Sequence, residues 1–235
     1  TPNSSAYGFF GYTDENAVIR NLNVELGGRF GSTSTTGSYH GVIIGNARKT
    51  VVQNCNVDGK ANMIAGNLSV GGIVGYAKEY VTIESCTTKN ITLQGASECG
   101  GIVGRAAALA TDGHITIKNC TVDNITSIVN VGYASGLIGL GEGANNTYGT
   151  NLIEDCFATN VTTTSGVSYS AGFAGALRQF NVTNCGVTDS TIKAGGSYAG
   201  GFVGVLYNGG KVTGCYAEDS TVTCNLNYAG GFSGA

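Results

Sequence analysis

A five-residue glycine box recurs eight times along the chain, and its period constrains the fold more than any other feature. Clear copies are Gly71-Gly-Ile-Val-Gly75, Gly100-Gly-Ile-Val-Gly104 and Gly200-Gly-Phe-Val-Gly204. The boxes close at Gly11, Gly45, Gly75, Gly104, Gly139, Gly175, Gly204 and Gly234. Neighbouring closing glycines lie 29 to 36 residues apart, so the chain contains seven repeats of about 30 residues.

Other residue columns keep the same period. A cysteine column comprises Cys55, Cys86, Cys120, Cys156, Cys185 and Cys215. An aliphatic residue lies three positions before each of these cysteines, and Asn90, Asn124 and Asn160 lie four positions after theirs. Six positions before the closing glycines stand Tyr39, Ser69, Glu98, Tyr133, Tyr169, Tyr198 and Tyr228. Columns that stay in phase over seven copies indicate one structural unit repeated along the chain.

The apolar segments are typical of strands. They are short, rich in β-branched residues and separated by Gly, Asn and Asp, whereas helical repeats need long runs with a 3.6-residue period. We predict three short strands per repeat, which in one repeat are 72–76, 81–87 and 91–94. The predicted fold is all-β: a right-handed parallel β-helix, or β-solenoid, of about seven coils. It forms a single domain over residues 1–235, and we expect this domain to be a fragment of a longer repeat protein. The glycine doublet is expected to form a tight corner through positive φ and close backbone approach.

Composition excludes several classes of protein. Only 11% of the residues are charged and the net charge is −3, which argues against a nucleic-acid partner because such proteins carry a basic face. No apolar run approaches the ~18 residues of a membrane helix, so we expect no direct membrane insertion. No CxxC pair occurs and there are only two histidines, so no metal site and no cofactor are predicted.

The recurrent columns have a structural interpretation. The six cysteines are predicted to pack as buried thiols in a narrow interior, although one or two disulfides remain open. Asn90, Asn124 and Asn160 are expected to hydrogen-bond from coil to coil at a turn. The four tyrosines from Tyr133 to Tyr228 are expected to stack as an offset ladder, with a carbohydrate-stacking platform as the alternative.

The Gly-Gly-apolar-Val-Gly box, followed by a turn, an apolar residue, a polar residue and a Cys/Thr/Tyr run, resembles the GLUG-type repeats of bacterial secreted and surface proteins. The resemblance extends from Gly8 to Gly234. It implies an extracellular or cell-wall protein of adhesin-like organisation, in which the repeats form a stalk or a binding module. No catalytic residue belongs to the repeat itself, so the resemblance implies none in this chain.

Two repeats carry extra residues at the same corner of adjacent coils, in segments 105–114 and 140–150. Insertions that gather on one face of a solenoid are common binding sites. The candidate binding patch there consists of Arg105, Asp112, His114, Glu142, Asn145, Asn146 and Tyr148. Its alternative roles are carbohydrate binding, polysaccharide degradation and a plain solvated loop.

The sequence therefore predicts a secreted or cell-surface module that acts as a stalk or binding scaffold and is not an enzyme. Its expected partner is a protein or glycan of a host or neighbouring cell. Self-association is a further alternative, because the repeat pattern shows no capping element at either end and unpaired strands favour end-to-end assembly into a fibre.

Overall fold

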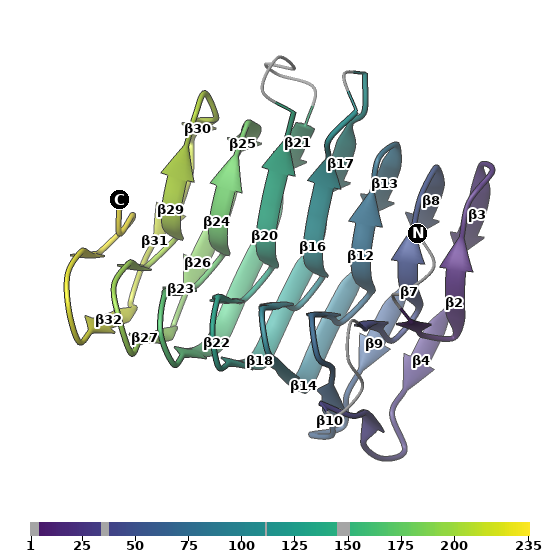
Figure 1. The fold of residues 1–235 in the computed structure, drawn as a ribbon, viewed down its shortest axis with the longest axis horizontal. Helices are drawn as coiled ribbons and strands as arrows, with labels where there is room; N and C mark the ends of the chain where they lie inside the picture. Colours follow the sequence, from purple (N-terminus) through teal and green to yellow (C-terminus); the bar gives the residue numbers. More distant parts are fainter. Residues whose placement is uncertain (1–4, 34–37, 111, 145–150) are drawn as a thin grey trace.

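The computed structural model describes residues 5–33, 38–110, 112–144 and 151–235. The described residues form strands, turns and loops, with no helix among them and hence no helix able to cross a membrane. Strands of successive coils pair in parallel and stack along the long axis of the molecule (Figure 1). The predicted all-β solenoid of about seven coils is confirmed.

Each coil contributes to four parallel sheets. Sheet A consists of β1 (Ala6–Tyr7), β6 (Tyr39–Gly41), β11 (Ser69–Gly71), β15 (Glu98–Gly100), β19 (Tyr133–Ser135), β23 (Tyr169–Ala171), β28 (Ala199–Gly200) and β33 (Ala229–Gly230). Sheet B consists of β2 (Phe10–Thr13), β7 (Ile44–Ala47), β12 (Val74–Lys78), β16 (Val103–Ala108), β20 (Ile138–Gly143), β24 (Ala174–Arg178) and β29 (Val203–Tyr207).

The other two sheets complete the coil. Sheet C consists of β3 (Ala17–Arg20), β8 (Thr50–Gln53), β13 (Val81–Glu84), β17 (Ile115–Lys118), β21 (Asn151–Glu154), β25 (Phe180–Thr183) and β30 (Lys211–Thr213). Sheet D consists of β4 (Asn23–Glu25), β5 (Phe30–Gly31), β9 (Asn56–Asp58), β10 (Met63–Ala65), β14 (Thr87–Gly95), β18 (Thr121–Val129), β22 (Phe157–Ser165), β26 (Gly186–Thr188), β27 (Thr191–Ala194), β31 (Tyr216–Ala217) and β32 (Thr221–Cys224).

A full coil thus has four strand faces instead of the predicted three. The glycine doublet separates sheet A from sheet B, so the expected strand 72–76 begins only at Val74. Positive φ is not the reason for glycine there, since neither Gly71 nor Gly72 has it. Close approach is the reason, because a Cβ on Gly71 would lie 1.9 Å from the carbonyl oxygen of Val74.

The corner between sheets C and D depends on a left-handed residue just before the cysteine column. The expected strand 81–87 is divided there, at Ser85 and Cys86. This position has positive φ at Asn54, Ser85, Asn119, Asp155, Asn184 and Gly214. Asn, Asp or Gly occupies five of these six positions and adopts this conformation at low cost, which favours the turn; Ser85 is the exception.

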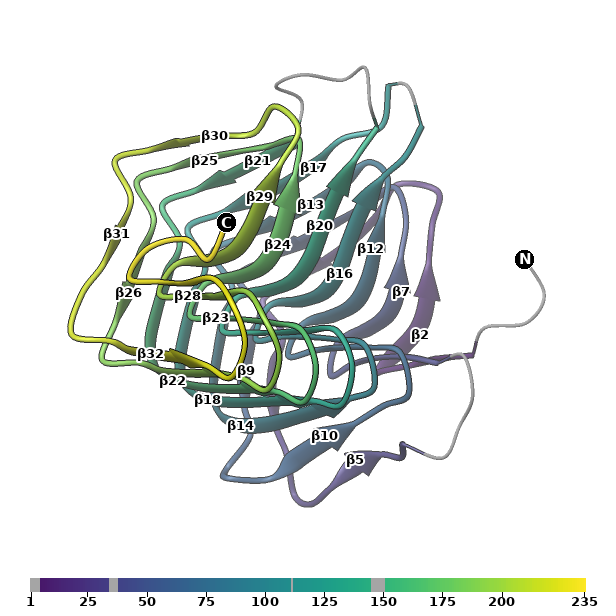
Figure 2. The same ribbon diagram turned by 60° about the vertical axis from the view of Figure 1, so that its left-hand side comes forward.

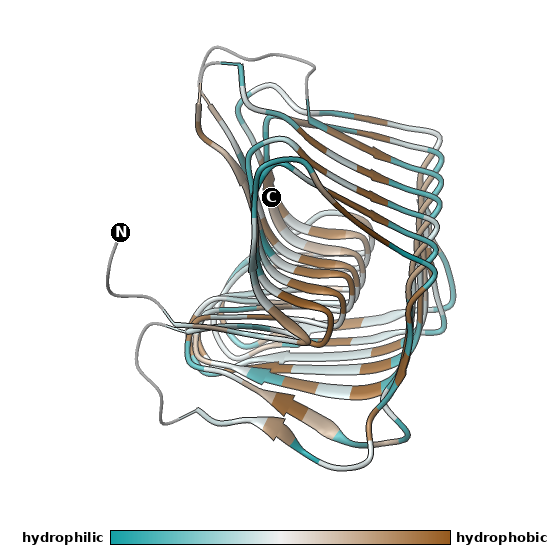
Figure 3. Cartoon of the chain, turned by 90° about the vertical axis from the view of Figure 1, so that its right-hand side faces the viewer, coloured by the Kyte–Doolittle hydropathy of each residue, from teal (hydrophilic) through white to brown (hydrophobic). Residues whose placement is uncertain are grey.

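The interior is a continuous apolar core built from stacked columns. Ile43, Ile73, Ile102, Leu137, Phe173 and Phe202 form one fully buried column. In the view along the axis, equivalent apolar residues form brown stripes that run from coil to coil (Figure 3). All eight cysteines are free thiols, and the predicted column is buried except at its C-terminal end, where Cys215 is half-buried. Within the column the amide of Cys120 donates to Sγ of Cys156 on the next coil at 3.4 Å. Burial raises the pKa of the Cys99 thiol, outside this column, well above its usual range.

Candidate binding groove

Sheets A and B meet at the glycine bend and form a re-entrant corner in the outline of each coil (Figures 2 and 3). Outward side chains of the two sheets face each other across this corner, which runs along the solenoid and is called the A–B groove here. Sheet A contributes Ala6, Tyr39, Ser69, Glu98, Tyr133, Tyr169, Tyr198 and Tyr228 in register or in stacking contact. Sheet B contributes Tyr12, Asn46, Tyr76, Arg105, Leu140, Ala176 and Val205, the residues that directly follow the closing glycines.

In the C-terminal half of the groove, tyrosine rings fill the corner. Tyr133 and Tyr169 stack with ring centroids 4.6 Å apart, and Tyr169–Tyr198 and Tyr198–Tyr228 follow at 5.0 Å each. The first three rings pack against the outward column Leu140, Ala176 and Val205 and help to bury it. Burial raises the pKa of the Tyr133 hydroxyl. The predicted ladder positions therefore form a continuous aromatic wall over aliphatic side chains.

Charged residues occupy the middle of the groove. Nη2 of Arg105 donates to Oε2 of Glu142 on the next coil at 2.6 Å, and the Arg105 guanidinium lies 5.7 Å from the centre of the Tyr76 ring. Glu98 is nearly buried and accepts a hydrogen bond from Ser69 Oγ at 2.7 Å. Burial raises the pKa of the Glu98 carboxyl, while the Ser69 hydroxyl and the charge of Arg105 act in the opposite direction. Both carboxylates are thus already held by neighbouring side chains.

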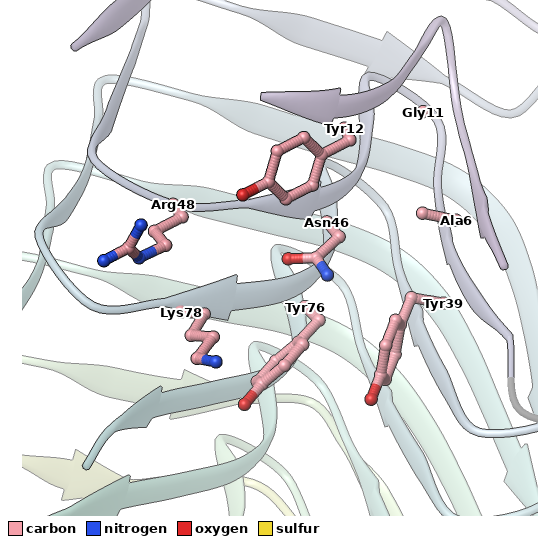
Figure 4. A pocket seen from close by; sticks show the side chains of 8 residues that line it. All are labelled: Ala6, Gly11, Tyr12, Tyr39, Asn46, Arg48, Tyr76 and Lys78. Atoms are coloured by element: carbon pink, nitrogen blue, oxygen red, sulfur yellow. The ribbon is translucent and has the colours of Figure 1, made fainter. Parts of the chain in front are cut away.

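The N-terminal half of the groove is open. A pocket of about 480 Å³ lies across the first three coils there (Figure 4). It is called the N-terminal pocket and is lined by Ala6, Gly11, Tyr12, Tyr39, Asn46, Arg48, Tyr76 and Lys78. A smaller hollow of about 270 Å³ lies in the C-terminal half, beside Tyr133, Leu140, Glu142, Arg178, Tyr207 and Asn208. Pocket volumes of ~300–1,000 Å³ are usual for small-molecule sites.

The structure divides the inserted-loop patch. Arg105 and Glu142 form the ion pair in the groove. Asp112 and His114 lie beyond the end of β16, near Tyr80, whose ring meets the His114 imidazole edge to face at 5.4 Å. The Tyr80 hydroxyl lowers the pKa of Asp112. Within the described residues no hydrogen bond or ion pair joins these two pairs. Asn145, Asn146 and Tyr148 lie outside the described residues.

The asparagine column lies inside sheet D, at positive φ, and bends the long strands. Asn124 Nδ2 donates to Asn90 Oδ1 at 2.9 Å, which is a coil-to-coil bond of the expected kind. Asn160 donates instead to Asp123 Oδ1 at 2.9 Å, because a carboxylate is available one position before Asn124. Among the described residues, no group of three or more His, Cys, Asp or Glu side chains is placed to hold a metal ion.

Sequence reasoning missed the main residues of the N-terminal pocket. Tyr12, Asn46 and Tyr76 each follow a closing glycine directly, and Arg48 and Lys78 lie two positions further on. Side chains at these positions point outward beside the glycine bend, so they line the A–B groove. The sequence feature that could have revealed them is the column directly after the glycine box. Its residues change from polar and aromatic in the first coils to aliphatic in the last coils.

Comparison with known proteins identifies one repeat directly. The family model of the GLUG motif matches residues 195–223, a stretch of one coil that includes β28 to β31 and most of β32. This match confirms the resemblance to GLUG-type repeats. No curated protein and no solved structure showed significant similarity to the chain.

Proposed function

We propose that the chain is an extracellular, adhesin-like repeat module whose solenoid is a rigid scaffold and whose A–B groove binds a glycan or protein on the surface of another cell. The observation that carries this proposal is the groove itself. Outward aromatic and charged side chains from successive coils meet in one concave corner, where they contribute to two hollows. Aromatic and Arg-rich concave surfaces are typical of recognition sites.

Secretion and surface display are part of the proposal. The GLUG match and the solenoid fold support a repeat-type module, and such modules present long binding surfaces on a stiff axis. The groove spans several coils, so it suits an elongated partner better than a small metabolite. A glycan chain or an exposed protein strand has the required length.

The two acidic side chains of the groove already have partners within the chain, and this favours a binding role without catalysis. Acid–base catalysis at a sugar or peptide needs carboxyl groups aimed at the ligand. In the groove Glu98 accepts from Ser69, and Glu142 is paired with Arg105. These contacts favour a role in positioning the groove wall, and we propose that the module performs no reaction of its own.

The test is binding of the purified, fluorescently labelled chain to fixed epithelial cells, to fixed bacterial cells and to a glycan array. A groove variant carries Tyr39→Ala and Tyr76→Ala together. A matched control carries Thr82→Ala and Thr116→Ala, two half-buried outward residues of sheet C, well away from the groove. We expect saturable binding that falls about tenfold or more in the groove variant, since truncated aromatic anchors typically cost ~1–2 kcal/mol each.

Thermal unfolding of both variants is measured alongside binding, so that loss of fold is not mistaken for loss of contact. Absence of saturable binding to every one of these surfaces would contradict the proposal. So would binding that the groove variant retains in full.

A further inference from the structure

The N-terminal pocket differs from the rest of the groove in its walls. Three tyrosines from three successive coils surround it, namely Tyr12 on β2, Tyr39 on β6 and Tyr76 on β12. Tyr39 and Tyr76 lie with ring centroids 4.8 Å apart at 37°, and Tyr12 is 58% exposed above them (Figure 4). Tyrosine combines a flat apolar face with a polar edge, which suits the CH face and hydroxyl rim of a sugar ring.

Two cations line the pocket, and they differ in whether a carboxylate of the described residues pairs with them. Arg48 is already paired, with Asp14 at 3.1 Å and with Glu79 at 3.6 Å. The hydroxyl of Tyr12 also donates to Asp14, at 2.7 Å. Lys78 lines the same pocket, is half-buried, and forms no ion pair with any residue that the structure describes. An anionic group entering the pocket therefore meets an ammonium group that has no competing carboxylate.

The pocket also contains an unused acceptor. Oδ1 of Asn46 is buried and has no hydrogen-bond partner among the described residues. Asn46 lines the pocket and stands between Tyr12 and Tyr76 in the register of sheet B (Figure 4). A buried acceptor without a donor is unfavourable, and a hydroxyl group bound beside it would satisfy it.

From these three features we propose that the N-terminal pocket binds a carboxylated sugar residue of a glycan. The tyrosine rings stack on the sugar ring, Lys78 holds the carboxylate, and Asn46 accepts a hydrogen bond from a ring hydroxyl. This inference rests on the proposed binding function and specifies its ligand. A sugar acid satisfies the apolar faces, the cation and the buried acceptor together, whereas an acidic peptide leaves the buried acceptor and the stacked rings less well matched.

The experiment is calorimetric titration of the whole chain with four oligosaccharides. Two are carboxylated, a hyaluronan hexasaccharide and 3′-sialyllactose, and two are neutral, chitohexaose and lactose. We expect at least one carboxylated oligosaccharide to bind about tenfold or more tightly than its neutral counterpart, as the loss of a charge-assisted hydrogen bond implies. Carboxyl-reduced hyaluronan serves as a chemically matched probe.

Variants assign the contact to the pocket. Lys78→Glu is expected to weaken carboxylate binding about tenfold or more, and Lys78→Arg to retain most of it, because the cation is preserved. Lys193→Glu is the matched control, since Lys193 is an exposed lysine of β27 on sheet D, remote from the groove. Asn46→Leu is expected to weaken the carboxylated and neutral ligands alike, because it removes the hydroxyl contact only.

Equal affinity for carboxylated and neutral sugars would overturn the inference, as would a Lys78→Glu variant that binds like the parent chain. Binding of neither class, measured up to millimolar concentration, would overturn it as well. If the chain still binds cells in a manner that depends on Tyr39 and Tyr76, the groove function survives and a peptide or neutral glycan becomes its ligand. If cell binding is also absent, both proposals fail.

Discussion

The two halves of the A–B groove share one backbone register and differ in what fills the corner. In the C-terminal half, tyrosine follows tyrosine, and the rings at 4.6–5.0 Å cover aliphatic side chains of sheet B. In the N-terminal half, Ala6 and Ser69 flank Tyr39 in the same column, and a pocket of about 480 Å³ opens. A repeated residue type closes the corner, and an interrupted column leaves space for a ligand.

The interior changes between the same two halves. The column of Ile43, Ile73 and Ile102 gives way to Phe173 and Phe202, whose rings stack at 4.4 Å. In the C-terminal half, aromatic rings therefore stack on both sides of the glycine bend, with Phe173 and Phe202 inside and the tyrosines outside. We therefore expect the C-terminal coils to be more stable than the N-terminal coils, which under the proposed function carry the ligand.

The largest expected effect concerns the interior. Phe173→Ala should lower the free energy of unfolding by about 3–5 kcal/mol, because it leaves a cavity and removes the stack on Phe202. Ile73→Ala in the same column should cost about 1 kcal/mol less, because no ring stacking is lost there. Urea unfolding followed by circular dichroism measures both. An equal or greater loss of unfolding free energy for Ile73→Ala would show that ring stacking adds no stability to the C-terminal core.

A smaller effect is expected on the outer face. Tyr169→Ala removes the ring contacts with Tyr133 and Tyr198 and uncovers part of the aliphatic column, which should cost about 1–3 kcal/mol. Tyr12→Ala is the matched change in the open half, where the ring is 58% exposed, and should cost less than about 0.5 kcal/mol. The midpoints of thermal unfolding compare the two. Similar losses would mean that the tyrosine stack adds little and that the two halves do not differ in this respect.

The periodic part of the molecule could be predicted from the sequence. The glycine box fixed the number of coils, and the columns at Ile73 and Cys86 identified interior positions, because stacked coils place equivalent residues one above another. The fourth strand could not be predicted in the same way. It is the sheet A strand Ser69–Gly71, which lies before the glycine doublet and has only three residues, too few for a recognisable strand pattern. Segment 81–87 has the pattern of one continuous strand, and only the left-handed φ of Ser85 turns it from sheet C into sheet D.

The candidate site was harder to predict for a geometric reason. Its two walls come from different strands, and whether Tyr39 faces Tyr76 depends on the angle at the glycine bend, which no residue pattern encodes. The inserted loops drew attention by their length. Yet the residues of that patch with a groove contact, Arg105 and Glu142, lie on regular strands.

The smallest effect is expected at the boundary between the two halves, where Glu98 interrupts the tyrosine column. Burial raises the pKa of the Glu98 carboxyl above its ordinary value of 4.5, so the folded chain holds this proton at a higher pH than the unfolded chain does. Stability must then fall as the pH rises from 4.5 through the folded pKa, and the loss persists at higher pH. Glu98→Gln removes the charge and keeps an acceptor for Ser69.

The variant should therefore unfold at a higher temperature than the parent chain at pH 7, and the difference should shrink toward pH 4. Melting curves between pH 4 and pH 8 test this, with Glu218→Gln as the control on an exposed carboxylate. A difference that is constant over this range, or that grows toward low pH, would mean that Arg105 and Ser69 fully compensate the burial of Glu98. In that case the charges of Glu98 and Arg105 would stabilise the groove. They would then strengthen the boundary between the two halves, although Glu98 interrupts the tyrosine stack.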